Sequence, residues 1–289
     1  MVEFVQALVD GVTLGATYSL LGLGFTLIFG VLRRLNLAYG PTILVGIYAG
    51  SHASLAWPGA FPAVLAVTVG GALLAGVYVE RFAFRTLADQ APVVSMIASF
   101  AVAMQLQELI ALTAASRTMP YPSPTWLPAA VAVGPILIRS DAILTWGGAM
   151  VIMLALFAVL YRTRFGAAIR ALSESPEAAA LVGINVTAMG AVAFLLASAV
   201  GGVAGVLVAA SQQQVTPYFG LWATVKGLTA MLLGGAGSLP GAVAGGVVLG
   251  VVETQALSHL GGQFRDLAAY ALLLLVVAAR GSSRGSAGL

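Results

Sequence analysis

The sequence has no cysteine and very few charged residues. Only 8% of its 289 residues are Asp, Glu, Lys or Arg, whereas a soluble globular domain usually carries about 25%. The absence of cysteine excludes disulfides, thiolate catalysis and cysteine metal sites. The two histidines, His52 and His259, are too few for a histidine-based metal centre. We therefore expect no metal site and no cofactor, and a chain with too little polar surface to be surrounded by water.

Three signals of other functions are also missing. No basic stripe with interleaved aromatic residues exists, so nucleic acid is not an expected partner. No G-x-x-x-x-G-K-[ST] phosphate loop exists, because the single lysine, Lys226, lies in V-K-G-L. The chain is therefore not expected to be an enzyme that hydrolyses ATP. The N-terminus carries Glu3 and Asp10 instead of the positive segment of a signal peptide, so its first apolar run is expected to remain as a span.

Apolar residues make up 60% of the chain. Several runs exceed the roughly 20 residues needed to cross a bilayer, and they do not alternate as barrel strands do. In lipid such runs satisfy their backbone hydrogen bonds as helices. We expect an all-α, polytopic transmembrane helical bundle that forms one domain over residues 1–289. The bundle should have about 8–9 spans, because the seventh range is short enough to re-enter the membrane instead of crossing it. The expected spans are about 11–32, 37–56, 60–79, 92–115, 142–161, 188–210, 219–235, 240–258 and 266–280.

Glycine is frequent, with 35 copies that punctuate nearly all of these ranges. Many leave a face of small residues, as in Gly201-Gly202-x-x-Gly205 and Gly241-x-x-x-Gly245. Small residues let membrane helices approach closely, because apolar side chains gain little by leaving lipid. These faces predict tight helix packing rather than direct ligand contacts.

The basic residues predict the orientation of the chain. With the N-terminus outside and nine crossings, nine arginines fall on one side and three on the other. Because cytoplasmic loops carry the excess of Lys and Arg, the larger group is expected to be cytoplasmic. That group is Arg33, Arg34, Arg81, Arg85, Arg162, Arg164, Arg170, Arg280 and Arg284. The outer group is Arg117, Arg139 and Arg265, and Lys226 lies near or within a span.

Two connections differ from the rest. The outer connection, about residues 116–141, is rich in proline and carries Trp126, so it is not expected to be a regular helix. The cytoplasmic connection, about residues 162–187, is charged and contains a helix signal. Ser175 can cap the helix, Pro176 fits its first position, and Gly183 can end it. An isolated helix this short is marginal in water, so it must pack on the bundle or on a partner.

The stretch RALSESPEAAALVGINVTAMGAVAF in this loop resembles the EAA-type loop of ABC importer permeases. Its E-A-A-x-x-x-G-I-N run is most similar to the branched-chain amino acid (leucine/isoleucine/valine-type) permease family. Residues 11–40 resemble the N-terminal span of that family. Residues 215–253, with a G-S-L-P-G turn, resemble its C-terminal signature. The chain departs from the family pattern at Tyr39 and Pro41, where a histidine and an acidic residue are usual, and in its tail RGSSRGSAGL.

The resemblance implies a multi-pass permease subunit of a binding-protein-dependent ABC importer in the bacterial inner (plasma) membrane. Branched-chain or other apolar amino acids would be its cargo. The implied partners are a second homologous permease, two cytoplasmic ATP-binding subunits, a periplasmic or extracellular substrate-binding protein, and membrane lipid. The residues implied to form or flank the ATPase-coupling loop are Arg170, Glu174, Glu177, Ala178, Ala179, Gly183 and Asn185.

Polar residues within the expected spans or at the start of one are candidates for the translocation pathway. A charge at the bilayer centre costs roughly 2.5–3.5 kcal/mol on insertion scales, so each one needs a reason. The candidates are Asn36, Tyr39, Gln105, Glu108, Lys226 and Glu253. The structural alternative is that Lys226 pairs with a glutamate to fix helix packing, or that the groups lie at the membrane interface.

Three other functions stay open on the sequence alone. A permease for urea or short amides would share these motifs. An ion-coupled secondary carrier would need a relay of buried carboxylates, for which Glu108 and Glu253 are few and peripheral. A membrane-embedded enzyme would need a nucleophile with a base or a metal cluster, and neither histidine has an obvious acidic partner.

Overall fold

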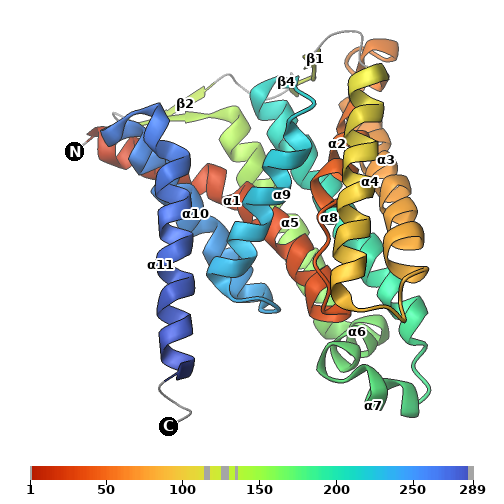
Figure 1. Cartoon of the computed structure of the whole chain (residues 1–289). Helices are drawn as coiled ribbons and strands as arrows, with labels where there is room; N and C mark the ends of the chain where they lie inside the picture. The colour runs from red at the N-terminus through yellow and green to blue at the C-terminus, as the bar shows by residue number, and fades with distance from the viewer. Residues whose placement is uncertain (1, 114–117, 125–129, 134–135, 286–289) are drawn as a thin grey trace.

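The computed structural model describes residues 2–113, 118–124, 130–133 and 136–285, and most of them are helical (Figure 1). The helices are α1 (Val2–Leu32), α2 (Tyr39–Ala56), α3 (Phe61–Val79), α4 (Pro92–Thr113), α5 (Ser140–Arg162), α6 (Arg164–Glu174), α7 (Pro176–Leu181), α8 (Val186–Gln212), α9 (Phe219–Gly234), α10 (Leu239–Leu260) and α11 (Arg265–Gly285). A π-helical segment, η1 (Glu80–Arg85), continues α3, and a 3-10 turn, η2 (Gly262–Phe264), precedes α11. Strand β1 (Met119–Pro120) pairs with β4 (Gln214–Val215), and β2 (Ala130–Val133) pairs with β3 (Ile136–Arg139), both antiparallel.

Each of the nine expected spans coincides with one long helix. Six helices of the described residues are long and apolar enough to cross a membrane: α1, α3 with η1, α4, α5, α8 and α10. Helix α9 is apolar but has only 16 residues. The helical membrane class is thus confirmed, and the expected eight or nine crossings stay a prediction. The largest difference in boundaries is at α1, which begins at Val2 because a helix can continue past its apolar stretch with Glu3 and Asp10 exposed.

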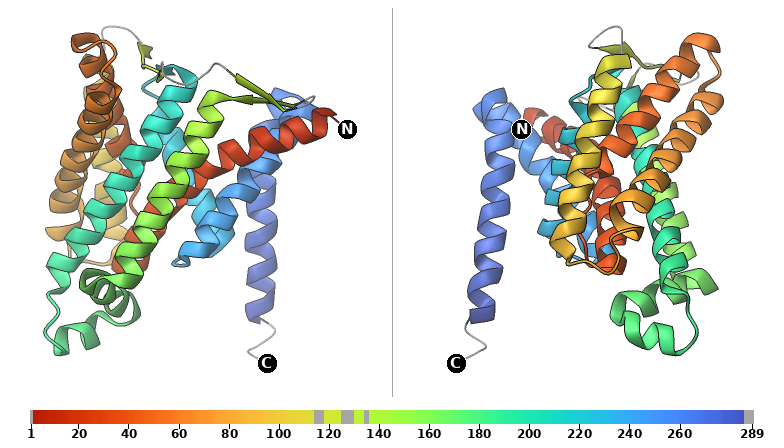
Figure 2. Two further views of the ribbon diagram at one scale, coloured as in Figure 1. Left: turned by 180° about the vertical axis from the view of Figure 1, so that it is seen from behind. Right: turned by 45° about the vertical axis from the view of Figure 1, so that its right-hand side comes forward.

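Helix α1 lies at the centre of the bundle. It runs obliquely from one end of the molecule to the other and packs against α8, α9 and α10 (Figures 1 and 2). Helix α2 packs against α3, α4, α8 and α9. Helix α11 stands apart from the bundle for most of its length and makes its main contacts with α9 and α10 (Figure 2).

Glycines allow the closest of these contacts. A Cβ atom on Gly15 of α1 would lie 2.7 Å from Val247 Cα of α10, so no larger residue fits there. The small-residue motifs act in the same way elsewhere. Gly205 of α8 faces Ile43 of α2, and Gly245 of α10 faces the backbone of α9. The expected tight packing is therefore observed.

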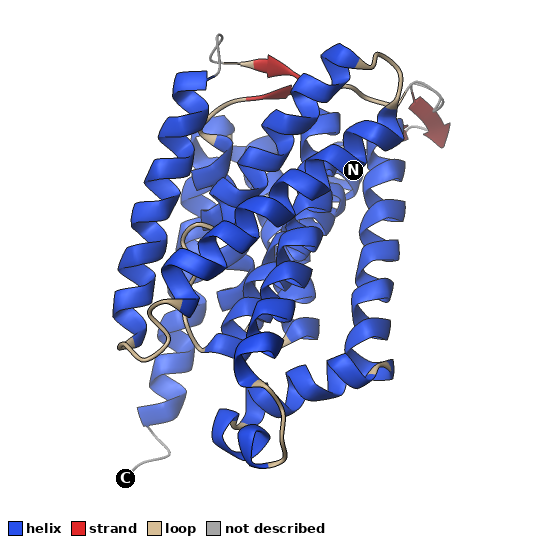
Figure 3. Ribbon diagram, turned by 90° about the vertical axis from the view of Figure 1, so that its right-hand side faces the viewer, coloured by secondary structure: helices blue, strands red, loops and turns tan. Residues whose placement is uncertain are grey.

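The two ends of the bundle carry different elements. Helices α6 and α7 lie at the end where α11 finishes, and the strands lie at the opposite end, near the N-terminus (Figures 1 and 3). Arg33, Arg34 and Arg81 follow or extend helices that finish at the α6–α7 end, whereas Arg139 directly precedes α5 and Arg265 begins α11 at the strand end. The arginines named here thus divide between the two ends as the sequence predicts, and an N-terminus outside the cell stays a prediction. Arg117 and Trp126 lie outside the described residues.

The described part of the outer connection consists of short strands and turns, as its proline content predicts. Tyr121 anchors it: its hydroxyl lies 2.8 Å from Thr68 Oγ1 of α3, and its N–H donates to Gln213 O at 3.0 Å. Burial raises the pKa of Tyr121 to about 12, so the phenol stays protonated at physiological pH. Ser51 of α2 also donates to Pro120 O at 2.6 Å. These bonds hold the connection over the ends of α2 and α3.

Candidate functional site

Helices α6 and α7, with their flanking residues 163–185, form a projection at one end of the bundle (Figure 1). Thr163 caps α6 by accepting a hydrogen bond from Gly166 N at 3.1 Å. Ser175 caps α7 by accepting one from Ala178 N at 3.2 Å, and it donates to Glu177 Oε2 at 3.0 Å. Pro176 begins α7, where its missing N–H removes no bond. The helix start expected from the sequence is confirmed.

Gly183 ends α7. Its φ of +83° lies in the left-handed region that favours glycine. Gly183 N donates to Ala180 O and Ile184 N donates to Ala179 O, both at 3.0 Å. Asn185 then caps α8 by accepting from Ala188 N at 2.9 Å. The turn from α7 into α8 is therefore short, and these backbone and side-chain hydrogen bonds hold it.

The projection is held on the bundle from one face. Its buried apolar side chains include Ile169, Leu172 and Ala179. Arg33, which follows α1, donates to Ser173 O at 2.7 Å. The Arg170 guanidinium lies over the ring of Tyr161 on α5, 5.1 Å from its centroid. These contacts join the projection to α1 and α5.

The opposite face of the projection is exposed. Leu181 is 89% and Val182 is 75% exposed at the end of α7. Glu177, Ala178 and Asn185 are also exposed, whereas Ala179 faces the bundle. Exposed apolar side chains that gather at one place mark interaction sites. The projection thus presents an apolar tip with a carboxylate beside it.

A cavity of about 300 Å³ separates the projection from the turn between α9 and α10. Arg170 and Glu174 of α6 line one side, and Gly237 and Ser238 of the turn line the other. Ser238 caps α10 by accepting from Gly241 N at 3.2 Å. The structure therefore brings together the charged loop and the G-S-L-P-G turn, which lie far apart in the sequence.

Lys226 and Glu253 lie in a buried ionic network near the start of α11. Lys226 Nζ is 2.6 Å from Glu253 Oε1 and 2.7 Å from Asp266 Oδ1. Glu253 Oε2 accepts hydrogen bonds from Tyr18 OH at 2.7 Å and from Arg265 Nε at 3.1 Å. The two cations balance the two carboxylates, and the network joins α1, α9, α10 and α11.

Burial makes this balance necessary. Lys226 is 2% exposed and Glu253 is fully buried. An isolated charge at such a position costs several kcal/mol, whereas a paired and hydrogen-bonded one is tolerated. The structure therefore shows the alternative in which Lys226 pairs with a glutamate between packed helices.

Comparison with known proteins identifies the family of the chain. Residues 7–277 match the family model described as "Branched-chain amino acid transport system / permease component". The chain belongs to this family. It is 33% identical to the high-affinity branched-chain amino acid transport system permease protein LivH of Salmonella typhimurium, over 95% of this chain and 92% of LivH. It is 31% identical to the corresponding permease protein BraD of Pseudomonas aeruginosa, over 95% of this chain and 93% of BraD.

The fold of this permease is shared with solved structures. The structure of PsaBC from Streptococcus pneumoniae in complex with Fab matches with a TM-score of 0.53 and 15% identity, over 94% of this chain and 90% of that chain. At this identity the match shows the fold alone. The family resemblance predicted from the motifs is confirmed by the relatives, and membership implies ATPase and permease partners.

Asn36 and Tyr39 lie inside the permease, at the turn into α2. Asn36 Oδ1 accepts from Ala38 N at 3.0 Å, and within the described residues its Nδ2 is buried without a hydrogen-bond partner. Tyr39 is fully buried, and its hydroxyl donates to Ala197 O of α8 at 3.1 Å. Its ring packs edge-on against Phe25, with centroids 4.8 Å apart. Tyr39 therefore joins α1, α2 and α8.

Gln105 and Glu108 lie on an exposed face of α4. Tyr78 of α3 donates to Gln105 Oε1 at 2.9 Å. Leu109 and Leu112, 54% and 83% exposed, line the same shallow surface hollow as these polar side chains. The pathway candidates thus fall in three separate places: the ionic network, the turn into α2, and this face of α4.

The sequence interpretation missed the partners of the ionic network. Tyr18 lies within an apolar run, and Arg265 and Asp266 stand at the start of the last helix as ordinary flanking charges. The missed signal is the balance of charge: Lys226 and Glu253 needed partners of opposite sign, and Arg265 and Asp266 supply them.

Among the described residues, no group of three or more His, Asp or Glu is arranged to hold a metal ion.

Proposed function

We propose that this permease moves branched-chain or other apolar amino acids across the bacterial inner membrane as one subunit of a binding-protein-dependent ABC importer. The whole chain acts as a single domain, and two separate ATP-binding subunits supply the energy. A second, homologous permease completes the pathway, and an external binding protein delivers the cargo. The observation that carries the proposal is similarity to LivH and BraD along 95% of the chain.

The projection provides the mechanical link in this proposal. Its apolar tip, Leu181 and Val182, and the carboxylate of Glu177 face away from the bundle, as a docking surface for an ATP-binding subunit requires. Arg33 ties the projection to the end of α1, and the short connections at Thr163 and Gly183 tie it to α5 and α8. Movement of a docked subunit is thereby transmitted into three long helices.

The exposed face of α4 that carries Gln105 and Glu108 beside Leu109 and Leu112 is our candidate for a wall of the pathway. A carboxylate such as Glu108 is costly to expose to hydrocarbon, and Tyr78, Gln105 and Glu108 gather on one face. We place this face toward the second permease, where water and cargo pass. An aliphatic cargo needs few charged contacts along its route. Lys226 and Glu253, which are paired and buried, serve helix packing in this proposal.

The test is uptake by the reconstituted transporter. The permease, its second permease and the ATP-binding subunits are placed in proteoliposomes, with the binding protein outside. Radiolabelled leucine should accumulate only with ATP inside and the binding protein present. Uptake of urea or acetamide in place of leucine would instead establish a short-amide importer. Leucine uptake driven by a proton or sodium gradient without ATP would establish a secondary carrier.

A further inference from the structure

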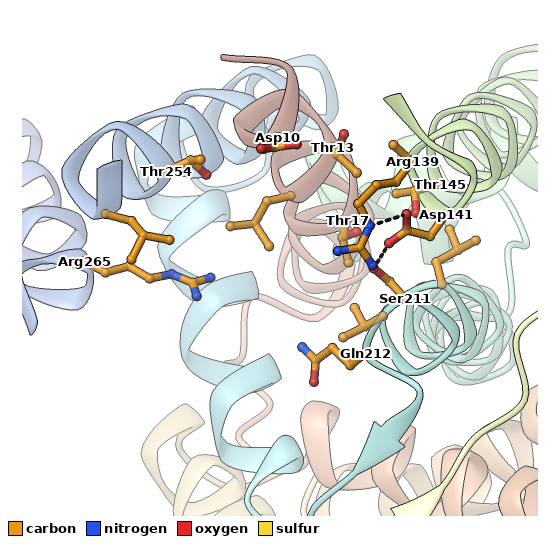
Figure 4. Close-up of a pocket in the computed structure, with 15 residues that line it drawn as sticks. Asp10, Thr13, Thr17, Arg139, Asp141, Thr145, Ser211, Gln212, Thr254 and Arg265 are labelled. Atoms are coloured by element: carbon orange, nitrogen blue, oxygen red, sulfur yellow. Dashed lines mark hydrogen bonds and ion pairs between the residues drawn. The ribbon is translucent and has the colours of Figure 1, made fainter. Parts of the chain in front are cut away.

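A second cavity, of about 330 Å³, lies at the strand end of the bundle (Figure 4). We name it the outer cavity. Its lining comes from α1, the last residue of β3, the start of α5, the end of α8, the end of α10 and the first residue of α11. This volume is at the lower end of the range for small-molecule sites. The outer cavity is separate from the projection and from the exposed face of α4.

Charges of both signs line the outer cavity in equal number. The acidic side chains are Asp10 and Asp141, and the basic ones are Arg139 and Arg265. Arg139 Nε pairs with Asp141 Oδ1 at 3.1 Å, yet the Arg139 side chain remains 63% exposed. Asp141 Oδ2 accepts from Ser211 Oγ at 2.5 Å, and each carboxylate oxygen has a second lone pair to offer. Arg265 already donates to Glu253 and Tyr18, and Asp10 accepts from Gln6, so Arg139 is the basic side chain most open to an occupant. With Arg139 and the two aspartates, the lining can hold an anionic and a cationic group at the same time.

Two threonine hydroxyls add polar groups to the lining. Thr17 of α1 is 4% exposed and Thr145 of α5 is 2% exposed, and both line the outer cavity. Among the described residues, neither oxygen is one of the buried side-chain atoms that lack a partner. Each hydroxyl can donate or accept a hydrogen bond, so a polar occupant can bond to them in place of water.

The rest of the wall is aliphatic. It consists of Leu14, Ala142, Leu207, Val208 and Leu257. An occupant that satisfies the whole lining has one positive group, one negative group and a short apolar side chain. Nucleic acid, sugars and simple ions lack this combination, and an α-amino acid has it.

We propose that the outer cavity binds the zwitterion of an α-amino acid with an aliphatic side chain. Arg139 holds the carboxylate, the aspartates hold the ammonium group, and Thr17 and Thr145 donate or accept the remaining hydrogen bonds. The aliphatic wall contacts the side chain. The site rests on the proposed function, because it lies at the end where a binding protein would release its cargo, and it makes the permease itself selective before transport.

The test is equilibrium binding of radiolabelled leucine to the purified transporter complex, without the binding protein. Unlabelled leucine should displace the label at least ~10-fold more effectively than 4-methylpentanoate, which lacks the ammonium group, or isopentylamine, which lacks the carboxylate. Thr145→Val removes a hydroxyl at nearly constant shape and should weaken leucine binding by ~10-fold. Thr113→Val is the matched control, because Thr113 on α4 is exposed and bonds only to its own helix.

Arg139→Gln gives a second, independent readout. The affinity of the variant for leucine should fall close to the affinity of the wild-type complex for isopentylamine. Assembly of the complex, measured by gel filtration, should be unchanged, since Arg139 is mostly exposed. Absence of leucine binding to the wild-type complex, or equal displacement by all three compounds, would overturn the site. The proposed function is tested separately. If the outer cavity binds no leucine but the proposed function is right, binding-protein-dependent leucine uptake in proteoliposomes would persist.

Discussion

Lys226 Nζ lies 2.6 Å from Glu253 Oε1, and both side chains are almost completely buried. Arg265 and Asp266, at the start of α11, complete a neutral network around this pair. Helix α11 otherwise stands apart from the bundle. The network is therefore a principal polar link between α11 and the helices of the core.

Glu253→Gln should destabilise the permease. The change leaves Arg265 without its carboxylate and leaves Lys226 with Asp266 alone. Removing one partner of a buried ion pair costs about 3–5 kcal/mol, so we expect a clear fall in the apparent melting temperature of the purified protein. Glu108→Gln is the control: it makes the same chemical change at an exposed position, where the effect should stay within about 0.5 kcal/mol. Equal melting temperatures for the two variants would show that the network does not hold α11.

Gly183→Val should weaken coupling through the backbone. The φ of +83° at Gly183 costs an L-residue roughly 1–2 kcal/mol, and a β-branched residue more. The turn into α8 would then distort, and ATP-driven uptake should fall severalfold although the protein still inserts in the membrane. Gly183→Asn is the matched variant, because asparagine tolerates this conformation. Uptake that falls equally in both variants would point to a side-chain clash with a partner instead.

Glu177→Lys should separate ATP hydrolysis from uptake. The side chain is exposed in the first turn of α7, so reversing its charge costs the helix only about 0.3–1 kcal/mol. The charge that position 177 presents on the docking surface, in contrast, changes from negative to positive. We expect normal membrane insertion, continued ATP hydrolysis and little leucine uptake. Glu3→Lys, also in the first turn of a helix but on α1, should transport normally, and wild-type transport by Glu177→Lys would remove the docking role of Glu177.

Local signals allowed much of this fold to be predicted. Apolar runs marked the long helices, and the Ser175-Pro176 start and Gly183 stop of α7 depend on bonds within a few residues. Helix α1 begins at Val2, before the expected span of about 11–32, because Glu3 and Asp10 interrupt the apolar run without interrupting the helix. Such polar residues at a chain end remain exposed, so hydrophobicity alone does not locate the first turn.

The candidate sites were predicted less completely, because they depend on contacts between distant segments. Glu253 is bonded to Tyr18 of α1, which precedes it by 235 residues. No spacing in the sequence predicts that contact. The outer cavity likewise takes Thr17, Thr145 and Arg265 from three different helices. The sequence supplied Glu253 and Lys226 as unusual residues, but only the packing of α1, α9 and α10 identified their partners.

Glu108→Leu distinguishes a wet pathway from a lipid-facing position. If Glu108 faced lipid, leucine would remove the cost of exposing a charge, and the variant would be more stable and fully active. Because we place this face of α4 toward the second permease and the water-filled route, we expect leucine uptake to fall at least ~10-fold while membrane insertion stays normal. Tyr78→Phe, which removes only the bond to Gln105, should have a smaller effect on uptake. Full activity of Glu108→Leu together with a raised melting temperature would move the pathway away from α4.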